Sequence, residues 1–211
     1  MTKKKLKFNH KLRVLNLYSG LGGNRKLWED VNVTAVEHDP KIAELYSRFY
    51  PQDKIVIGDA HQYLISNLDK FDFIWSSPPC QSHSKMSISG RHRKPRYADM
   101  KLYEEIILLR QYFKGDWIVE NVKPYYEPLI PAQQVGRHLF WSNYEISAED
   151  VKRPKNFINS GTVADKVKLQ NWLDIHYDEN VYYGKNHDPC QILRNCVHPK
   201  LGEQVFNSHK T

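Results

Sequence analysis

Cys80 is the residue whose type and position could most directly do chemistry. It follows Pro78 and Pro79, which in turn follow an apolar run over residues 72–77 that predicts a buried strand. Active sites of α/β folds lie just past the carboxyl ends of their strands, and two prolines would stiffen the turn that carries the thiol. A thiol there can act as a nucleophile if a neighbouring group activates it. Because an isolated cysteine is more often a buried structural residue, the interpretation depends on what surrounds it.

Glu120 is the second residue with a chemical interpretation. It lies near the end of another apolar run, residues 116–121, so it would share an edge of the sheet with Cys80 if the two strands are parallel neighbours. A carboxyl group in a partly dry pocket can have a raised pKa and can donate a proton near neutral pH. Taken alone, Glu120 would more often be an ordinary helix cap. Together with Cys80 it predicts a catalytic pair.

A glycine-rich turn over residues 19–23 predicts where a cofactor could bind. Glycines there let the backbone approach a ligand closely, although the turn lacks the Gly-Lys-Ser/Thr of a phosphate-binding loop. Glu37 and Asp59 end the next two predicted strands. Glu37 could accept hydrogen bonds from both hydroxyls of a ribose, and Asp59 could accept one from an exocyclic adenine amine. The alternatives are a solvated glutamate and a helix cap, but the three features together favour an adenosine pocket.

These residues need a sheet to bring them together, and the chain alternates short apolar runs with helical patterns. The predicted strands are residues 13–18, 33–37, 54–59, 71–75, 116–121 and 138–141. The predicted helices are residues 41–50, 61–68 and 102–113, with a closing turn and helix within residues 190–207. Such alternation predicts an α/β fold with a mostly parallel sheet and helices on both faces. From about residue 142 to residue 188 the periodicity is weak.

Size, charge and cysteine content narrow the function classes. The 211 residues suit one domain with a small appendage, and no apolar stretch approaches the ~18 residues of a membrane span. The basic start lacks the apolar segment of a secretory signal, and three widely spaced cysteines indicate no disulfide framework, so we expect a cytoplasmic protein. Cys190 and Cys196 lack the spacing of a zinc knuckle, so we expect no metal. The net charge of +7 suits a polyanion partner, and basic residues crowd into residues 89–97.

Read in order, several short segments resemble the signature motifs of the cytosine-5 DNA methyltransferases. They are residues 17–23, Glu37, residues 58–59, residues 77–81 and residues 120–122, and residues 193–199 are similar to that family's last motif. The resemblance covers roughly residues 12–141 and 189–207, and the Pro-Cys-Gln and Glu-Asn-Val segments are its most specific part. It implies a Rossmann-like, α/β methyltransferase fold that binds S-adenosylmethionine (SAM).

The resemblance implies a reaction in which Cys80 adds to carbon 6 of a cytosine flipped out of double-stranded DNA. Glu120 would hold or protonate ring nitrogen 3, and carbon 5 would then take the methyl group of SAM. Asn121 would help to position the pocket, and Arg137 is a candidate for contact with the ring. Two alternatives remain open: a tRNA cytosine-5 methyltransferase, and an inactive relative that only binds SAM or nucleic acid.

The same resemblance assigns two further groups of residues. The cofactor would be held by Tyr18, Ser19, Gly20, Gly22, Gly23, Glu37, His38, Asp59, Ala60, Pro78 and Asn195. Nucleic acid would be contacted by Gln81, Ser84, Lys85, Arg91, Arg93, Lys94 and Arg96. We expect a monomer from a bacterium or bacteriophage, with restriction–modification as one setting.

The chain departs from the family pattern in several places. Where the family's Gln-x-Arg-x-Arg element has its arginines, this sequence has Gly136 and His138, with Arg137 shifted by one position. Arg194 replaces a usual glycine, and Asn16 replaces a usual acidic residue. The largest departure is size. We predict a catalytic domain of residues 1–141 and 189–211, with a small, irregular, reduced target-recognition region at residues 142–188.

Overall fold

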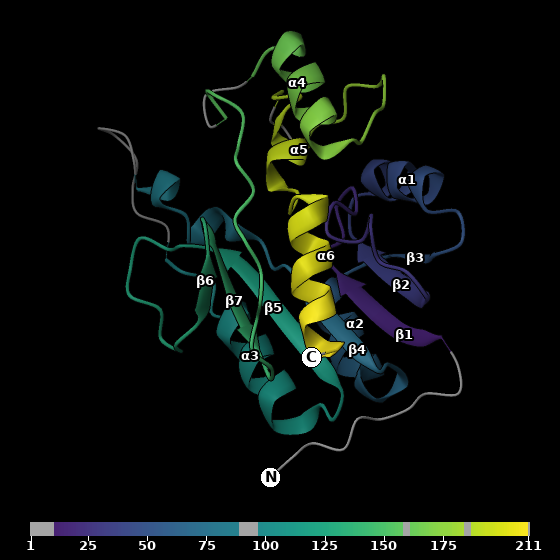
Figure 1. Ribbon diagram of the computed structural model, residues 1–211, viewed down its shortest axis with the longest axis vertical. Coiled ribbons are helices and arrows are strands. Elements are labelled where there is room, and N and C mark those ends of the chain that lie inside the picture. The colour runs from purple at the N-terminus through teal and green to yellow at the C-terminus, as the bar shows by residue number, and fades with distance from the viewer. Residues whose placement is uncertain (1–10, 89–96, 158–160, 184–186, 211) are drawn as a thin grey trace.

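A mostly parallel sheet carries the candidate residues at one of its edges. The computed structural model describes residues 11–88, 97–157, 161–183 and 187–210. Within these residues, seven strands form one sheet in the order β3-β2-β1-β4-β5-β7-β6 (Figure 1). The first five strands pair in parallel, and the last two pair antiparallel at one end of the sheet. The strands are β1 Leu12–Leu17, β2 Val31–Glu37, β3 Lys54–Ile57, β4 Phe73–Ser76, β5 Asp116–Val122, β6 Gln133–Val135 and β7 His138–Ser142.

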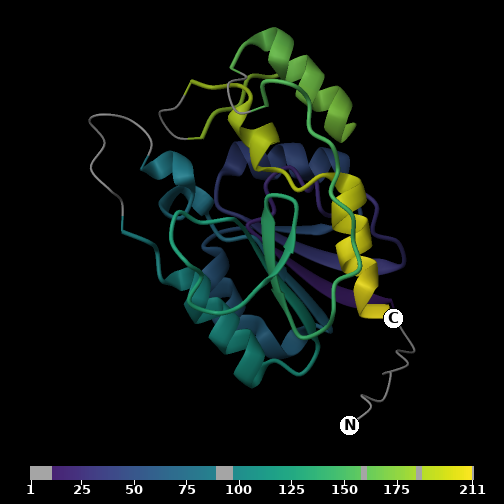
Figure 2. The same ribbon diagram turned by 60° about the vertical axis from the view of Figure 1, so that its left-hand side comes forward.

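Apolar side chains bury both faces of this sheet. In β1, Val14 belongs to one core cluster and Leu15 to another, because successive side chains of a strand point to opposite faces. Helices α2 (Ala60–Asn67) and α3 (Lys101–Tyr112) contribute Leu64 and Ile106 to the Leu15 cluster. Helix α6 (Pro199–Asn207) contributes Val205 to the Val14 cluster and lies across the other face (Figure 2). The predicted α/β fold, with a mostly parallel sheet and helices on both faces, is therefore confirmed.

Two aspartates begin helices directly after strands. Asp39 caps α1 (Pro40–Phe49) by accepting hydrogen bonds from the backbone N–H groups of Lys41 and Ile42. Asp59 caps α2 in the same way, by accepting from the backbone N–H of Gln62 at 3.0 Å. The strand that the sequence predicts over residues 54–59 consequently ends earlier, at Ile57. The capping role that the sequence leaves open for Asp59 is thus present in the structure.

Helix α4 (Val163–Leu173) forms inside the segment for which the sequence shows only weak periodicity. Its start is fixed by a capping box. The side chain of Thr162 accepts from the backbone N–H of Asp165, and the side chain of Asp165 accepts from the backbone N–H of Thr162. It buries Leu169 and Leu173 in a cluster that includes α1 and the short helix α5 (Gln191–Asn195). Two buried leucines give too weak a periodic pattern for the sequence to predict this helix. The prediction of an irregular segment is therefore wrong for residues 163–173.

The beginning of the same segment runs along the sheet and α6. The Tyr144 hydroxyl donates to the backbone oxygen of Val205, and the backbone N–H of Ser147 donates to Ser208 Oγ. Tyr144 and Ile146 pack against the cluster that α6 completes. Residues 144–151 are therefore held by the sheet and α6, whereas Phe157 packs in the same cluster as α4, which lies beside α1 and α5 (Figure 1). Every helix in the described ranges is too short or too polar to cross a lipid bilayer.

Candidate active site

A cavity of ≈ 730 Å³ lies along the carboxyl edge of the parallel strands. The segments that follow β1, β2, β3 and β4 contribute to its wall, together with the last residues of β5, the start of α3 and α5. It brings together the four predicted catalytic residues Cys80, Glu120, Asn121 and Arg137. It also includes most of the predicted cofactor residues, namely Tyr18, Ser19, Gly20, Gly23, Glu37, His38, Asp59, Ala60, Pro78 and Asn195.

Cys80 begins a single 3₁₀ turn that directly follows the two prolines. The thiol is half-buried and faces the cavity. The backbone oxygen of Cys80 accepts from the N–H groups of His83 and Ser84, which closes the turn. His83 is buried, and its Nδ1 lies 2.5 Å from the hydroxyl of Tyr126 on the segment after β5. The loop that carries the thiol is thus anchored on both sides, as a positioned nucleophile requires.

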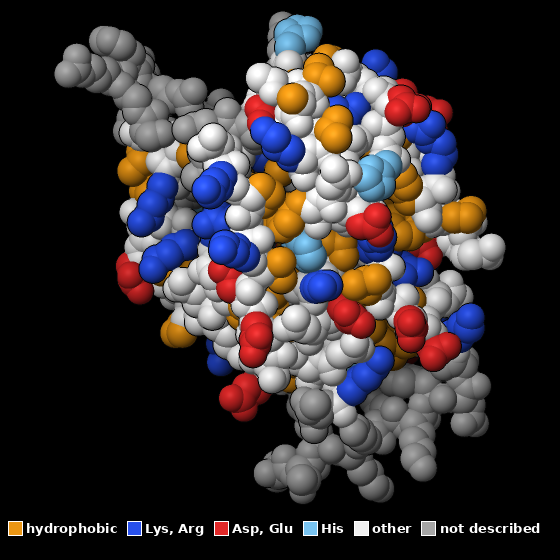
Figure 3. Space-filling view, turned by 45° about the horizontal axis from the view of Figure 1, so that its top comes forward, with side chains coloured by type: hydrophobic (Ala, Val, Ile, Leu, Met, Phe, Trp, Pro, Cys, Tyr) orange, Lys and Arg blue, Asp and Glu red, His pale blue; other side chains and the backbone are white. Residues whose placement is uncertain are grey.

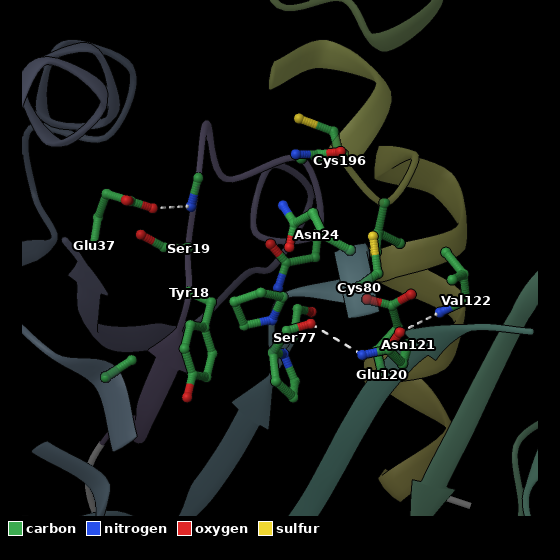
Figure 4. Close-up of a pocket in the computed structure, with 18 of the residues that line it drawn as sticks. Tyr18, Ser19, Asn24, Glu37, Ser77, Cys80, Glu120, Asn121, Val122 and Cys196 are labelled. Carbon is green, nitrogen blue, oxygen red and sulfur yellow. Dashed lines mark hydrogen bonds between the residues drawn. The ribbon is translucent and has the colours of Figure 1, made fainter. Parts of the chain in front are cut away.

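Asn121 holds the proline turn in place. Its Nδ2 donates to the backbone oxygen of Pro78 at 3.0 Å, and its Oδ1 accepts from the backbone N–H of Val122 at 2.9 Å (Figure 4). Asn121 is buried at the end of β5, next to β4 in the sheet. One amide therefore fixes the end of β5 and the turn before Cys80 relative to each other. This is a positioning role for Asn121.

Glu120 has a partner that the sequence does not predict. Glu120 Oε1 accepts a hydrogen bond from Nδ1 of His138 at 2.6 Å, and both side chains are buried. Burial alone would raise the pKa of the Glu120 carboxyl, but His138 and the charge of Arg137 outweigh it and hold that pKa below its ordinary value. The sequence-based expectation of a raised pKa at Glu120 is therefore wrong. The carboxylate is ionised in the free site.

The Cys80 thiol has a raised pKa. Burial is the main cause, the nearby charge of Glu120 adds to it, and Arg137 opposes it. The negative charge of Glu120 therefore acts on the Cys80 thiol, and Figure 4 shows the two side chains next to one another. Arg137 acts on both, while its own Nη2 donates to the backbone oxygen of Arg194 at 3.1 Å. The arrangement places a nucleophile, a carboxylate and a cation around one space.

Glu37 organises the opposite half of the cavity. Its Oε2 accepts from the backbone N–H of Gly20 at 3.0 Å, and its Oε1 accepts from the N–H groups of His38 and Asp39 at 2.9 and 3.0 Å (Figure 4). The glutamate is buried at the end of β2. Each carboxylate oxygen has two lone-pair directions, so the three N–H groups leave one acceptor position, on Oε2, for a hydroxyl group of a ligand.

The glycines of the turn after β1 have different roles. Gly20 has a φ of +53°, and a Cβ at this position would meet no atom within 4 Å, so the backbone is open to the cavity. Gly22 has a φ of +72° and lies against the rings of Tyr46 and Tyr50, away from the cavity lining. A Cβ on Gly23 would approach the backbone oxygen of Val197 to 2.5 Å. Gly22 and Gly23 thus permit close packing of the turn.

The cavity wall includes a buried polar atom without a hydrogen-bond partner in the described ranges, as expected for a site that binds a polar ligand such as SAM. Ser19 Oγ is buried, lines the cavity and has no hydrogen-bond partner among the described residues. Gly20 and Glu37 line the same cavity, and Asn195 lines it from α5. A buried hydroxyl without a partner costs free energy, and a bound polar ligand would remove that cost. The residues present therefore fit the cofactor.

Three of the seven predicted nucleic-acid residues belong to the described residues, and they lie outside this cavity or at its margin. Gln81 lines the cavity and is exposed. Ser84 forms an isolated bridge with Pro124, and its Oγ accepts from the backbone N–H of Met86. Lys85 is exposed on the following turn. The remaining four predicted residues, Arg91, Arg93, Lys94 and Arg96, lie outside the described residues.

Several cavity residues were missed by sequence reasoning. His138 contacts Glu120 only because β7 pairs antiparallel with β5, and spacing along the chain does not reveal that register. Tyr183 and Leu102 also line the cavity, but the sequence around them contains no motif that indicates a cofactor site. Asn16, noted as an unusual residue, accepts from Asn24 Nδ2 at 2.8 Å behind the glycine turn. No group of three or more His, Cys, Asp or Glu side chains in the described part of the chain is arranged to hold a metal ion.

Comparison with known proteins shows similarity over the same region. The family model for the C-5 cytosine-specific DNA methylases matches residues 12–128. Mouse (Mus musculus) tRNA (cytosine(38)-C(5))-methyltransferase is 28% identical over 119 residues, which are 53% of this chain and 29% of that protein. Type II methyltransferase M.FnuDI of Fusobacterium nucleatum is 31% identical over 115 residues, 53% of this chain and 33% of that protein. Type II methyltransferase M1.HgaI of Avibacterium volantium is 34% identical over 89 residues, 37% of this chain and 24% of that protein. The matches therefore span a third or less of each relative's length.

Proposed function

Because this chain belongs to the family of C-5 cytosine-specific DNA methylases, we propose that it transfers a methyl group from SAM to carbon 5 of cytosine in DNA. The observation that carries the proposal is the shared cavity. Cys80, Glu120 and Arg137 lie around one part of it, and the glycine turn with Glu37 forms the other. One site can therefore hold a pyrimidine ring and a methyl donor together.

Cys80 supplies the nucleophile. Carbon 5 of cytosine is too electron-poor to take a methyl group directly, so the Cys80 thiolate adds to carbon 6 and makes carbon 5 nucleophilic. Arg137 favours the thiolate, because its charge opposes the rise in the pKa of Cys80. After methyl transfer, loss of the carbon-5 proton to solvent restores the double bond and expels the Cys80 thiolate.

Glu120 stabilises the negative charge that this addition creates on the ring. Addition at carbon 6 pushes electron density to ring nitrogen 3, which becomes more basic. Because the Glu120 carboxylate is ionised in the free site, it takes up a proton from solvent as the cytosine ring enters the cavity. This proton lies between the carboxyl group and nitrogen 3 and moves toward the ring as the charge develops. His138 holds Oε1 of Glu120 at 2.6 Å, so the carboxyl group keeps its orientation while the proton moves. The lowered pKa of Glu120 makes its acid form a stronger proton donor.

The cofactor is SAM, which supplies an electrophilic methyl group. Glu37 accepts a hydrogen bond from a ribose hydroxyl through Oε2, and the Ser19 hydroxyl, which has no partner in the described part of the chain, binds a polar group of the cofactor. Asp59 lies at the adenine end, where the oxygen not used for capping Gln62 can accept from an amine. Tyr18, His38 and Ala60 complete the wall around the base.

The polymer substrate is proposed to be double-stranded DNA, with the target base flipped out of the helix. The target carbon is not reachable inside a duplex, so the base must enter the cavity alone. The net charge of +7 suits a polyphosphate, and Figure 3 shows a group of neighbouring Lys and Arg side chains at the left of the face that it presents, with others spread over the rest of that face. We further propose residues 142–188 as a reduced target-recognition region and the protein as a cytoplasmic monomer of a restriction–modification system or phage.

A second candidate substrate is tRNA. The mouse tRNA methyltransferase matches over as much of this chain as M.FnuDI does. The two candidate substrates are distinguished by incubating the protein with tritiated SAM and either duplex DNA or tRNA. Label in DNA supports the proposal, and label confined to RNA replaces it. Bisulfite sequencing of plasmid from cells that express the protein, against the Cys80→Ala variant as control, then gives the sequence context of the modified cytosines.

A further inference from the structure

We propose that Glu105 is a positioning residue for the cofactor, whose single buried carboxylate holds together three walls of the SAM pocket. The inference rests on the proposed function, because it assigns SAM to the cavity. It adds a residue that does not line the cavity and lies outside the motifs at the strand ends. Glu105 lies on α3 and is completely buried, with 0% exposure.

Three donors from three different elements meet at this carboxylate. The Tyr18 hydroxyl donates to Oε1 at 2.6 Å, and the Ser76 hydroxyl donates to Oε2 at 2.5 Å. Nδ1 of His61 lies 3.0 Å from Oε1. A buried carboxylate is costly unless it is paired and hydrogen-bonded, so Glu105 strongly favours the arrangement in which all three donors are present.

Each donor adjoins a part of the cavity wall. Tyr18 lines the cavity itself and leads into the glycine turn. His61 follows Asp59 and Ala60, which line the adenine end. Ser76 is the last residue of β4, directly before the turn that leads to Cys80. Glu105 therefore fixes the ends of β1 and β4 and the start of α2 relative to one another.

Tyr18 shows why this wall needs an anchor. Its backbone has a φ of +55°, in the left-handed region that costs free energy for a residue with a side chain. Burial, together with the negative charge of Glu105, raises the pKa of the Tyr18 hydroxyl far above its ordinary value, so the hydroxyl remains a donor. The bond to Glu105 thus opposes relaxation of the turn and keeps the Tyr18 ring against the cofactor space.

Neighbouring Glu104 provides a matched control. It lies one position earlier on α3, its side chain is 60% exposed, and it reaches only the outer nitrogen of His61, at 3.3 Å. Glu105→Gln keeps the shape of the side chain but replaces one acceptor oxygen by a donor, so at least one of the three donors loses its partner. Glu104→Gln makes the same chemical change at the surface.

The test measures binding of S-adenosylhomocysteine by calorimetry and methylation kinetics for the full chain. Glu105→Gln is expected to raise the dissociation constant and the KM for SAM by about tenfold or more, as expected for loss of a hydrogen bond to a buried charge. The rate at saturating SAM and the KM for nucleic acid should stay within about twofold. Glu104→Gln should change none of these by more than about twofold. Equal binding by Glu105→Gln and wild type would overturn the inference.

Two further variants separate positioning from a general loss of stability. Ile106→Val removes a buried methylene from the same helix and should lower the melting temperature without changing the dissociation constant. Tyr18→Phe keeps the ring and removes only the hydroxyl, so it tests the same contact if Glu105→Gln does not fold. It should weaken binding by about threefold to tenfold, and an unchanged value would also contradict the inference. Absence of binding by the wild-type chain would instead contradict the proposed function.

Discussion

At the scale of single residues, the Cys80 thiol is subject to opposing influences. Burial and the charge of Glu120 raise its pKa, and Arg137 opposes them. The sequence predicts that Cys80 and Glu120 meet, since both lie at the carboxyl ends of strands that are predicted to be parallel neighbours. It does not predict the direction in which the pKa of Glu120 moves, because that direction depends on His138. His138 reaches Glu120 because β7 pairs antiparallel with β5, and the register of this pairing cannot be predicted from the local sequence.

The rate of methylation should rise with pH across the neutral range. The reactive species is the thiolate, and the pKa of Cys80 is raised, so the thiolate is a minority species below that pKa. Its fraction grows about tenfold per pH unit there. Single-turnover rates between about pH 6 and pH 8 provide the measurement, with the affinity for S-adenosylhomocysteine over the same range as control. A flat profile would show that addition of Cys80 does not limit the reaction.

Cys80→Ala should abolish methylation while leaving SAM affinity nearly unchanged. The substitution removes the nucleophile, whereas Glu37 and the glycine turn remain in place on the opposite half of the cavity. The measurement is transfer of tritium from labelled SAM, together with trapping of a covalent adduct on DNA that contains 5-fluorocytosine. Cys190→Ala is the matched control, since that thiol is buried outside the cavity lining. Turnover by Cys80→Ala would refute its assignment as the nucleophile.

Glu37→Ala should weaken SAM binding by about 1–3 kcal/mol, the usual cost of leaving buried polar groups unpaired. The variant removes the carboxylate that accepts from the backbone N–H groups of Gly20, His38 and Asp39. It also removes the acceptor that is proposed for the ribose. Calorimetry with S-adenosylhomocysteine measures the change. Glu44→Ala, an exposed glutamate on α1, should bind like wild type. An unchanged dissociation constant for Glu37→Ala would remove Glu37 from the pocket.

At the scale of elements, hydrophobic patterning predicts the central strands and the helices that cover them. β1, β2, β4 and β5 are rich in buried apolar residues, so their existence follows from the sequence. β6 is only three residues long, and α4 is stabilised by its capping box and two buried leucines. Tertiary contacts decide whether such short or weakly patterned segments become regular, and the sequence alone does not contain them.

Gly23→Ala should destabilise the contact between the glycine turn and the segment after α5. The added Cβ would lie 2.5 Å from the backbone oxygen of Val197 and 2.9 Å from Cys196 Cβ, so backbone must move. We expect a loss of about 1–3 kcal/mol in the free energy of unfolding, measured by urea denaturation. Gly58→Ala adds a Cβ that meets no atom within 4 Å and should cost less than about 0.5 kcal/mol. Equal stability of the two variants would contradict the proposed close packing.

At the scale of the whole molecule, the basic charge should control association with nucleic acid. Affinity is expected to fall linearly on a plot of log K against log salt concentration, because phosphate contacts release counterions. Lys85→Ala should reduce the magnitude of the slope by about 1 if Lys85 contacts a phosphate. Lys114→Ala should leave the slope unchanged, since Lys114 precedes β5 and lies at the opposite edge of the sheet. Fluorescence anisotropy with a labelled duplex measures both, and equal slopes would remove Lys85 from the interface.

The cavity wall joins segments that are far apart in the sequence. The wall behind the glycine turn is made by residues 195–197, and Gly202 of α6 lies against the backbone of Asn24. The cofactor pocket is therefore complete only when residues 195–202 have packed against the segment that follows β1. A substitution that loosens this long-range contact should weaken cofactor binding even though it lies far along the chain from the strand ends that carry Glu37 and Asp59.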